Sequence, residues 1–586
     1  MAADTTTHLQ DAQLSGWGSR SLFAIATLIG LLAGTAAWGF RLLIGLIHNF
    51  SFFGVFSLVY DANVHTAPSS WSWLVIFIPV IGGVVVIFLI ENFAPEAKGH
   101  GVPEVMDAIY YRRGRIRGVV SIVKAVASAI TIGTGGSLGR EGPIVQISAA
   151  FSSVFAQWLK LPMSQRNLLI ACGASGGIAA TFNAPLGGIL FSVELLMLSV
   201  NSRTLLPVII SSVIAANVGR YLIGPDPAFH VTTTALASNT NPLILAVYFP
   251  FGAVVGLLAL VFIKSVYWSE NWFDNLPMNP YQRHMLGMLA LGSLFYGFHE
   301  LAGHYYVQGV GYATIQDIVS GKLTSLWLLL LLLGGKLLAT MLTIGSGGSG
   351  GVFSPSLYLG ATCGGLFGYA LSAVFPGLGV DPLTLALVGM AAMVAATTSA
   401  PMTAAIMTYE LTLDYVVVLP IMVGVAVAYS VRHYFSKGDI YTLKLMRRGQ
   451  NVPQGLFADM NSQIIVNDIM DRAIEFVHKE DVITGSDSTC CVVDENNKVI
   501  GIINPISYRK GIQFRAQDAM LTEFIPLRSG MNLRQAFHEI DRYERVMAVV
   551  SVNGSLDADQ ILGVLSPFNL TRVMANASQM HESQAQ

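Results

Sequence analysis

Long parts of this chain carry almost no charge, which leaves few folds open to it. Between Lys336 and Glu410 the only charged residue is Asp381. Uncharged apolar stretches long enough to cross the hydrocarbon core of a bilayer recur at residues 22–40, 73–90 and 243–263. A water-soluble domain could not surround such a core with polar surface. The sequence therefore predicts a polytopic membrane protein built of helices.

The charges that do occur gather near the C-terminus. Of the 586 residues 53% are hydrophobic and 12% charged, and 31 of the Asp, Glu, Lys and Arg residues fall after residue 441 against 37 before it. This distribution predicts a large membrane domain with a small soluble appendage. The net charge of −2 gives no reason to expect a nucleic-acid partner. The expected divisions are an N-terminal segment (1–20), a membrane domain (21–443), a linker (444–455), a soluble α/β domain pair (456–575) and a disordered tail (576–586).

Topology follows from the basic residues and from the first apolar stretch. That stretch is longer than the apolar core of a signal peptide, so it is interpreted as a retained helix. Lys and Arg gather in cytoplasmic loops, which predicts a cytoplasmic N-terminus and tail, in a cell membrane. Two basic clusters carry this prediction: Arg112, Arg113, Arg115 and Arg117 in one loop, and Lys444, Arg447 and Arg448 after the last apolar segment. The four cysteines lack metal-site spacing, so neither a zinc site nor a disulfide is expected.

The membrane part contains an internal repeat. Residues 132–143 match residues 344–355 at seven of twelve positions, with an offset of 212, and Lys124 and Lys336 share that offset. Chance similarity between glycine-rich membrane segments is the alternative interpretation.

The match continues downstream of the glycine-rich segments. Residues 179–185 pair with residues 395–401 at an offset of 216, which also pairs Glu194 with Glu410. Two halves of one design are therefore predicted, at about 21–225 and 243–443. Repeats interrupted by Gly and Pro at matching positions indicate a transport site at the repeat interface.

The two glycine-rich breaks are candidates for an anion site. Irregular backbone at membrane depth is favourable only where it lines a cavity or is buried by protein. A helix that begins there directs free amide groups and a positive dipole end at the break, which favours an anion. Gly139-Arg-Glu-Gly-Pro143 and Gly351-Val-Phe-Ser-Pro355 are two such helix starts. Helix kinking or close packing by small residues is the alternative.

Glu141 lies within one of these breaks. An ionisable residue at membrane depth suggests function. Its carboxylate could occupy the anion site when no ion is bound, and protonation would weaken that attachment. A salt bridge with Arg140 is the alternative; otherwise Arg140 supplies positive potential near the site or holds the loop.

These motifs resemble the CLC family of chloride channels and transporters. The resemblance spans about residues 20–445 and rests on the two helix starts just named, on the isolated Tyr441, and on Gly99-His-Gly-Val-Pro103, where the family usually has Gly-Ser-Gly-Ile-Pro. It implies a homodimer with one pore in each subunit, built of two inverted-repeat halves with broken helices.

The resemblance also implies roles for particular residues. Glu141 would be the gating glutamate, and Gly139, Arg140 and Gly142 around it would be anion-binding residues. The amides of Val352 and Phe353 and the hydroxyl of Tyr441 would hold the central anion. Lys124 matches a basic residue near the pathway in relatives.

Two positions depart from the family pattern. His100 replaces the usual serine; it can still donate a hydrogen bond to the anion, or it turns away and an amide substitutes. Leu195 stands where proton-coupled exchangers often carry an inner glutamate. Glu194 is one residue earlier, about 100° away around a helix, so it should not simply replace that group.

The tail contains a second, smaller repeat. Val499-Ile-Gly-Ile-Ile-Asn-Pro505 is similar to Ile561-Leu-Gly-Val-Leu-Ser-Pro567, and a Val-Val pair precedes each. The tail resembles the paired CBS modules of many CLC proteins, with a shortened first unit. An adenine nucleotide is a possible ligand but is not expected, because an obvious phosphate-binding glycine loop is lacking.

The predicted function is passive or proton-coupled transport of a small inorganic anion, most simply chloride. The sequence favours channel-like or weakly coupled conduction slightly over Cl−/H+ antiport, and another anion such as nitrate or fluoride remains an alternative. A membrane enzyme is the rival class. It would need converging catalytic groups, and neither a Gly-x-Ser-x-Gly elbow nor a His-Glu-x-x-His motif occurs. No cofactor, metal or catalytic residue is expected.

Overall fold

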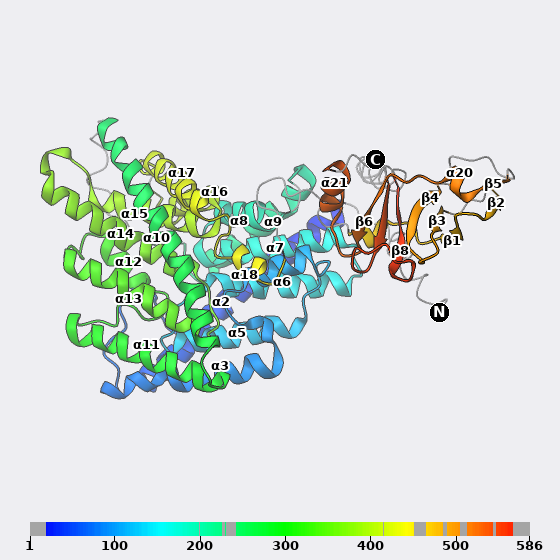
Figure 1. Ribbon diagram of the computed structural model, residues 1–586. Coiled ribbons are helices and arrows are strands. Elements are labelled where there is room, and N and C mark those ends of the chain that lie inside the picture. The colour runs from blue at the N-terminus through cyan, green and yellow to red at the C-terminus, as the bar shows by residue number, and fades with distance from the viewer. Residues whose placement is uncertain are drawn as a thin grey trace. The chain divides into compact units, whose positions relative to one another are not determined.

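The chain divides into two units, Met1–Leu456 and Phe457–Gln586, in the computed structural model shown in Figure 1. The structure describes residues 19–197, 200–225, 229, 242–413, 415–450, 465–484, 489–503, 513–542 and 547–566. The predicted segment 1–20, apart from its last two residues, and the predicted tail 576–586 lie outside the described residues.

The first unit is helical and contains two series of helices in matching order. The first series is α2 (Ser19–Phe53), α3 (Ile78–Phe93), α4 (Val102–Tyr110), α5 (Gly118–Gly133), α6 (Glu141–Trp158), α7 (Met163–Phe182), α8 (Pro185–Leu195) and α9 (Ser202–Leu222). The second series is α10 (Pro242–Asp274), α11 (Pro280–Ala302), α12 (Tyr312–Val319), α13 (Leu326–Gly345), α14 (Phe353–Val374), α15 (Pro382–Thr398), α16 (Pro401–Thr412) and α17 (Val418–Phe435). Helix α18 (Thr442–Arg447) follows.

The helices have the length and composition of membrane spans. Eight helical segments among the described residues are long and apolar enough to cross a bilayer. The predicted stretches 22–40 and 243–263 fall within α2 and α10, and 73–90 is covered by a 3-10 turn (Ser72–Phe77) and α3. The predicted polytopic helical fold is confirmed.

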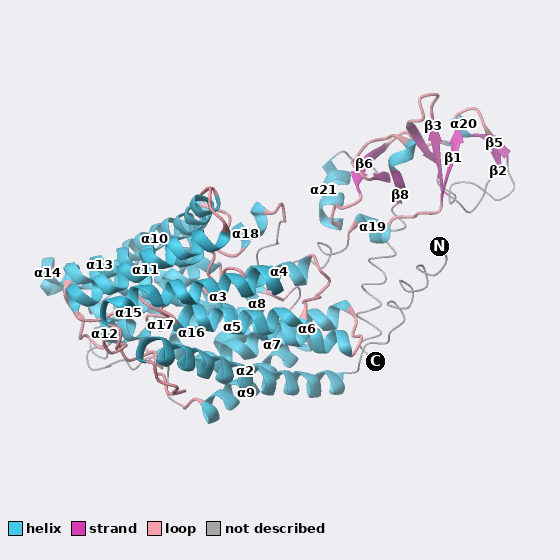
Figure 2. Cartoon of the chain, turned by 90° about the horizontal axis from the view of Figure 1, so that it is seen from below, coloured by secondary structure: helices cyan, strands magenta, loops and turns pink. Residues whose placement is uncertain are grey.

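Packing repeats between the two series. Helix α2 packs against α7 and α9, which lie beside it in Figure 2, and α10 packs in the same way against α15 and α17. Helix α6 packs on α7 as α14 packs on α15. The two series meet where α3 contacts α11 and α8 contacts α16.

The contact between α8 and α16 is reciprocal. The Glu410 carboxylate near the end of α16 accepts hydrogen bonds from the amides of Leu186 (3.0 Å) and Gly187 (2.7 Å) in the first turn of α8. The Glu194 carboxylate near the end of α8 accepts from two amides in the first turn of α16, at 2.9 and 2.8 Å. Each carboxylate therefore satisfies free amides at the start of the other helix. Such reciprocity is what a local twofold relation between the halves produces.

The second unit contains two similar three-stranded sheets. Each sheet has a buried central strand, parallel to one neighbour and antiparallel to the other. The sheets are β1 (Ile474–His478), β3 (Thr489–Val493) and β4 (Val499–Ile503), and β6 (Phe524–Arg528), β7 (Met547–Ser551) and β8 (Ile561–Leu565). Strands β2 (Val482–Thr484) and β5 (Gln513–Arg515) form an antiparallel pair. The short helices are α19 (Val466–Ile469), α20 (Ala516–Ala519) and α21 (Leu533–Arg542).

The predicted tail repeat maps onto equivalent strands. Residues 499–503 form β4 and residues 561–565 form β8, and the Val-Val pairs lie in β3 and β7. Helix α21 lies between β6 and β7, whereas the shorter connection from β1 to β3 contains β2 and the undescribed residues 485–488. The unit is thus a small α/β domain, and its assignment as a CBS pair stays a prediction.

The predicted linker, 444–455, begins inside a helix. Its first residues belong to α18, and residues 451–455 lie outside the described part.

Candidate anion site

Two helix starts meet inside the first unit. Helix α6 begins at Glu141 and α14 at Phe353, each directly after a glycine-rich loop. The loops are joined by a pair of backbone hydrogen bonds, from Gly139 N to Gly351 O and from Gly351 N to Gly139 O, both 2.7 Å long. The free amides and the positive ends of both helix dipoles therefore lie close to one buried place.

The loop before α4 joins this arrangement. Gly99 and Gly101 have φ values of +77° and +89°, which favour glycine. The Gly99 amide donates to Gly348 O (3.1 Å), and Gly99 O accepts from the Gly350 amide (3.2 Å). A Cβ atom on Gly142 would lie 2.2 Å from the His100 carbonyl oxygen, so the start of α6 packs directly on the His100 backbone. The structure brings these loops together, with Val352 at the N-cap of α14.

Glu141 is held by two neutral hydroxyl groups. Its side chain is buried, and its carboxylate accepts a hydrogen bond from the Tyr312 hydroxyl and from Ser354 Oγ, which lies 2.8 Å from each carboxylate oxygen. Among the described residues Glu141 has no ion-pair partner. The Arg140 guanidinium instead lies over the Tyr312 ring, 5.3 Å from its centroid. The alternative of an Arg140–Glu141 salt bridge is not what the structure contains.

Tyr312 and Ser354 were missed by the sequence reasoning, although a signal for Tyr312 exists. Residues 309–312 read Gly-Val-Gly-Tyr and match the Gly-His-Gly-Val of residues 99–102 at an offset of 210. Gly311 has a φ of +80°, and α12 begins at Tyr312 as α4 begins at Val102.

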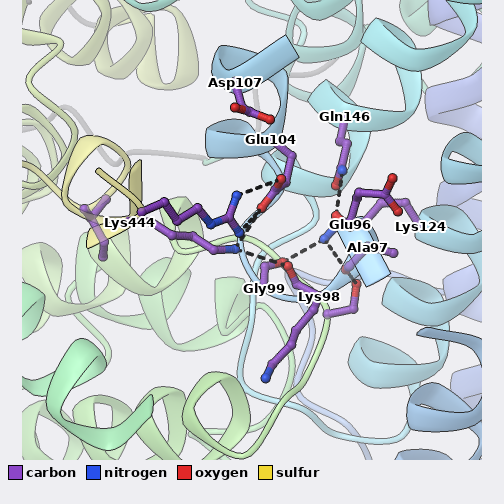
Figure 3. A network of polar contacts seen from close by, with 12 residues as sticks. Glu96, Ala97, Lys98, Gly99, Glu104, Asp107, Lys124, Gln146 and Lys444 are labelled. Carbon is purple, nitrogen blue, oxygen red and sulfur yellow. Dashed lines mark hydrogen bonds and ion pairs between the residues drawn. The ribbon is translucent and has the colours of Figure 1, made fainter. Parts of the chain in front are cut away.

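Two buried lysines secure the loops before α4 and α12. Lys124 Nζ donates to the carbonyls of Ala97 (2.9 Å) and Gly99 (2.7 Å), as Figure 3 shows. Lys336 Nζ does the same to two carbonyls of the matching loop, at residues 307 (3.2 Å) and 309 (2.9 Å). The structure thus places Lys124 beneath the His100 loop, where its hydrogen bonds go to backbone carbonyls.

His100 and Tyr441 are both buried near the start of a helix. Neither ring nitrogen of His100 has a hydrogen-bond partner among the described residues, and the ring lies edge-on to Tyr267 at 6.3 Å between centroids. Tyr441 is the N-cap residue of α18, and its amide donates to Asp439 Oδ1 (2.8 Å). A buried ring nitrogen without a partner is unfavourable unless a ligand or water satisfies it.

An ion-pair cluster connects α4 with α18. The Glu104 carboxylate, in the first turn of α4, contacts Lys444 Nζ at 3.2 Å and Arg448 Nη2 at 2.7 Å (Figure 3 shows Glu104 beside Lys444). Burial alone would raise the pKa of Glu104, but the charges and hydrogen bonds of Lys444 and Arg448 outweigh it and lower the pKa to about 2. The cluster, which the sequence did not indicate, fixes the helix that follows Tyr441 against the helix that follows His100.

Glu194 and Leu195 lie at the end of α8, outside the group of Glu141, Tyr312 and Ser354, called the Glu141 cluster below. The Glu194 carboxylate is occupied by the amides that begin α16 and by the Thr403 hydroxyl (2.5 Å). Leu195 is buried in the apolar core. Neither contributes a hydrogen bond to Glu141.

A cavity of about 260 Å³ opens beside the Glu141 cluster. Its lining includes two basic residues, Arg41 and Arg140, one acidic residue, Asp61, and Tyr312. Tyr312 therefore borders the cavity and also contacts Glu141. In the part of the chain that the structure describes, no group of three His, Cys, Asp or Glu side chains is placed to hold a metal ion.

The fold and the site define a multi-pass membrane protein in which broken helices surround a buried carboxylate. A family model described as voltage gated chloride channel matches residues 82–433. The chain therefore belongs to the CLC family, whose members are anion channels and transporters rather than enzymes.

Relatives in this family carry the names of both channels and exchangers. The chain is 31% identical over 391 residues to a putative chloride channel protein ClcB-like of Ralstonia nicotianae, with 66% of this chain and 88% of that protein covered. It is 33% identical over 385 residues to an H(+)/Cl(−) exchange transporter ClcA of Vibrio parahaemolyticus, with 65% and 81% covered.

Two solved structures share the fold. A slow cyanobacterial Cl−/H+ antiporter matches with a TM-score of 0.62 at 24% identity, covering 73% of this chain and 97% of that one. A eukaryotic CLC transporter matches with a TM-score of 0.61 at 21% identity, covering 93% and 97%.

Proposed function

We propose that this chain conducts chloride, or a small inorganic anion like it, along a pathway that the Glu141 carboxylate closes. One observation carries the proposal: a buried carboxylate lies at the meeting point of helix starts and is held there by neutral hydroxyl donors. Helix N-termini and hydroxyl groups bind a negative charge without a fixed cation. An inorganic anion can therefore replace the carboxylate on the same kind of donor.

Release of the carboxylate is the opening step in this account. Protonation of Glu141 removes the charge that the two hydroxyls and the helix dipoles attract. No basic side chain is left unpaired when the carboxylate withdraws, because none among the described residues is paired with it. The vacated position then becomes available to an anion from the cavity that Arg41 and Arg140 line.

We assign the central anion to the start of α14. Its proposed ligands are the amides of Val352 and Phe353, the Tyr441 hydroxyl and the His100 ring. The support for His100 is its buried ring, whose nitrogens lack partners among the described residues. Chloride is the proposed anion, because it appears in the names of relatives. Nitrate and fluoride are the alternatives.

For coupling we propose channel-like or weakly coupled conduction. Two observations support this: Leu195 offers no group that exchanges protons, and the Glu194 carboxylate is occupied as a helix cap. Cl−/H+ antiport is the alternative, and the exchange transporters among the relatives favour it.

The coupling test measures both ions in one preparation. Purified protein in liposomes is exposed to a chloride gradient while the external pH is recorded, and the reversal potential is then measured with an added pH gradient. A reversal potential fixed by the chloride gradient alone is expected. A steady shift with pH at constant chloride would establish antiport, and Glu194→Gln would then test that carboxylate as the proton relay.

The assembly is also a proposal. We expect a homodimer with one pathway in each subunit, in a cell membrane, with both termini cytoplasmic. Residues 456–575 are assigned to a CBS pair, and residues 450–575 are expected to modulate transport or support the dimer without requiring a nucleotide. Removing them should leave transport in folded protein, and its complete loss would show that the tail is essential.

A further inference from the structure

The repeat offers an internal comparison for each residue of the Glu141 cluster. At an offset of 212, Glu141 corresponds to Phe353, and Ser354 corresponds to Gly142. At an offset of 210, Tyr312 corresponds to Val102. All three members of the cluster are thus polar where the matching residue of the other half is apolar or glycine. The fold forms each helix start without these side chains, so the cluster is an addition to the framework.

The Tyr312 ring has a packing role that its hydroxyl does not share. The ring is buried, with Phe229 edge-on at 5.3 Å and Phe182 at 6.5 Å between centroids. A phenylalanine would fill the same space and keep these contacts. The hydroxyl is directed at the Glu141 carboxylate and also lies 3.2 Å from Ser354 Oγ. Because a buried hydroxyl is unfavourable without a partner, the Tyr312 O–H needs an acceptor, which is the carboxylate in the closed pathway and otherwise Ser354 Oγ or an anion that replaces the carboxylate.

We propose that Tyr312 is a latch and a selectivity residue of the anion pathway. This inference rests on the proposed function of Glu141. While the carboxylate is in place, the Tyr312 hydroxyl donates to it and stabilises the closed pathway. When the carboxylate withdraws, the same hydroxyl donates to the anion that enters from the cavity, because Tyr312 borders both. Tyr312 thus acts where the site borders the cavity, whereas Tyr441 is assigned to the central anion.

Among the described residues, the charged or titratable groups that interact with this cluster include Arg140 over the Tyr312 ring, Lys336 on α13, and Tyr441 before α18. Lys336 is fixed by the loop carbonyls at 307 and 309. Replacing Tyr312 by phenylalanine removes one hydroxyl and leaves these groups in place, so a changed pH response reports the lost hydrogen bond.

The test compares chloride efflux from liposomes, as a function of pH, in the wild type, Tyr312→Phe, Glu141→Gln and the double variant. Loss of a hydrogen bond to a charged group should move the midpoint of the curve of chloride efflux against pH by roughly one pH unit, or about tenfold in proton concentration. Tyr312→Phe should therefore open at a pH about one unit higher and pass more chloride at neutral pH. In the Glu141→Gln background it should leave the flux independent of pH and still change the ratio of chloride to nitrate flux.

Two controls separate the latch from general effects. Tyr358→Phe makes the same chemical change on α14, at a buried hydroxyl outside the cluster of Glu141, Tyr312 and Ser354, and should keep the wild-type midpoint. Ser354→Ala removes the other donor to Glu141 and should shift the midpoint in the same direction as Tyr312→Phe. Melting temperatures of the purified variants show that each one is folded.

The outcomes distinguish two failures. If Glu141→Gln removes the pH dependence but Tyr312→Phe keeps both the wild-type midpoint and the wild-type anion ratio, the latch is refuted and the gate stands. If Glu141→Gln keeps the wild-type pH dependence, the proposed function of Glu141 is itself refuted.

Discussion

Gly139→Ala should open the pathway by displacing the gate. A Cβ atom at this position would lie 2.2 Å from Glu141 Oε2 and 2.7 Å from Ser354 Oγ, where ordinary contact begins at 3.4 Å. The carboxylate would have to retreat by about 1 Å, which breaks its 2.8 Å hydrogen bonds to Ser354. Both clashing atoms are ends of side chains, so the backbone pair between Gly139 and Gly351 can persist.

The size of the effect follows from the lost hydrogen bond. A hydrogen bond to a charged group contributes about 1.5–3 kcal/mol. Loss of that stabilisation shifts the equilibrium between closed and open pathway by about ten- to a hundredfold, since about 1.4 kcal/mol is tenfold. Chloride efflux at neutral pH should rise accordingly, up to the level of Glu141→Gln, and its pH dependence should flatten.

The assay is chloride efflux from liposomes under a fixed gradient, with two matched alanine variants. Gly334→Ala should behave as wild type, because nothing lies within 4 Å of the new Cβ. Gly351→Ala should impair folding, because its Cβ would lie 2.7 Å from the Gly142 backbone nitrogen, which cannot move aside. Wild-type efflux and wild-type pH dependence in folded Gly139→Ala would refute the position assigned to Glu141.

Two further predictions concern α4 and the loop before it. Glu104→Gln should lower the melting temperature at pH 7. The corresponding loss of unfolding free energy is at most about 3 kcal/mol, and it is smaller to the extent that solvent screens Arg448. Because the pKa of Glu104 is lowered from 4.5 to about 2, the stabilisation is present above pH 4.5, and the difference from wild type should vanish as the pH falls through 2. His100→Ser should change the ranking of chloride against nitrate or bromide, and His100→Ala should weaken anion binding. Both variants are compared with wild type by the ratios of their anion fluxes. Equal ratios in all three proteins would mean that the ring faces away from the anion.

The features that could be predicted from the sequence are those that depend on local pattern. Apolar length predicts the spans, and the offset of 212 predicts two matched halves, because each helix start is encoded by adjacent residues. Glu141 is conspicuous as a carboxylate within a glycine-rich break. For the same reason the strand repeat of the tail is visible at residues 499–505 and 561–567.

Contacts between distant segments could not be predicted from the sequence. Tyr312 is 171 residues from Glu141, and only two glycines and a helix start mark its motif. The carbonyl partners of Lys124 and the ion pairs of Glu104 depend on how the loops fold together. The alternative partner proposed for Glu141, Arg140, is adjacent in sequence but points elsewhere. Adjacent side chains near a helix start diverge by about 100°, which favours partners from other elements.

The most direct test of the central claim is the pH dependence of chloride efflux in Glu141→Gln liposomes. The variant keeps the size of the side chain and removes its charge, so it represents the permanently released gate. We expect efflux equal to or above the wild-type maximum and constant across pH. Efflux that follows the wild-type pH dependence would contradict the claim, because another group would then control the pathway.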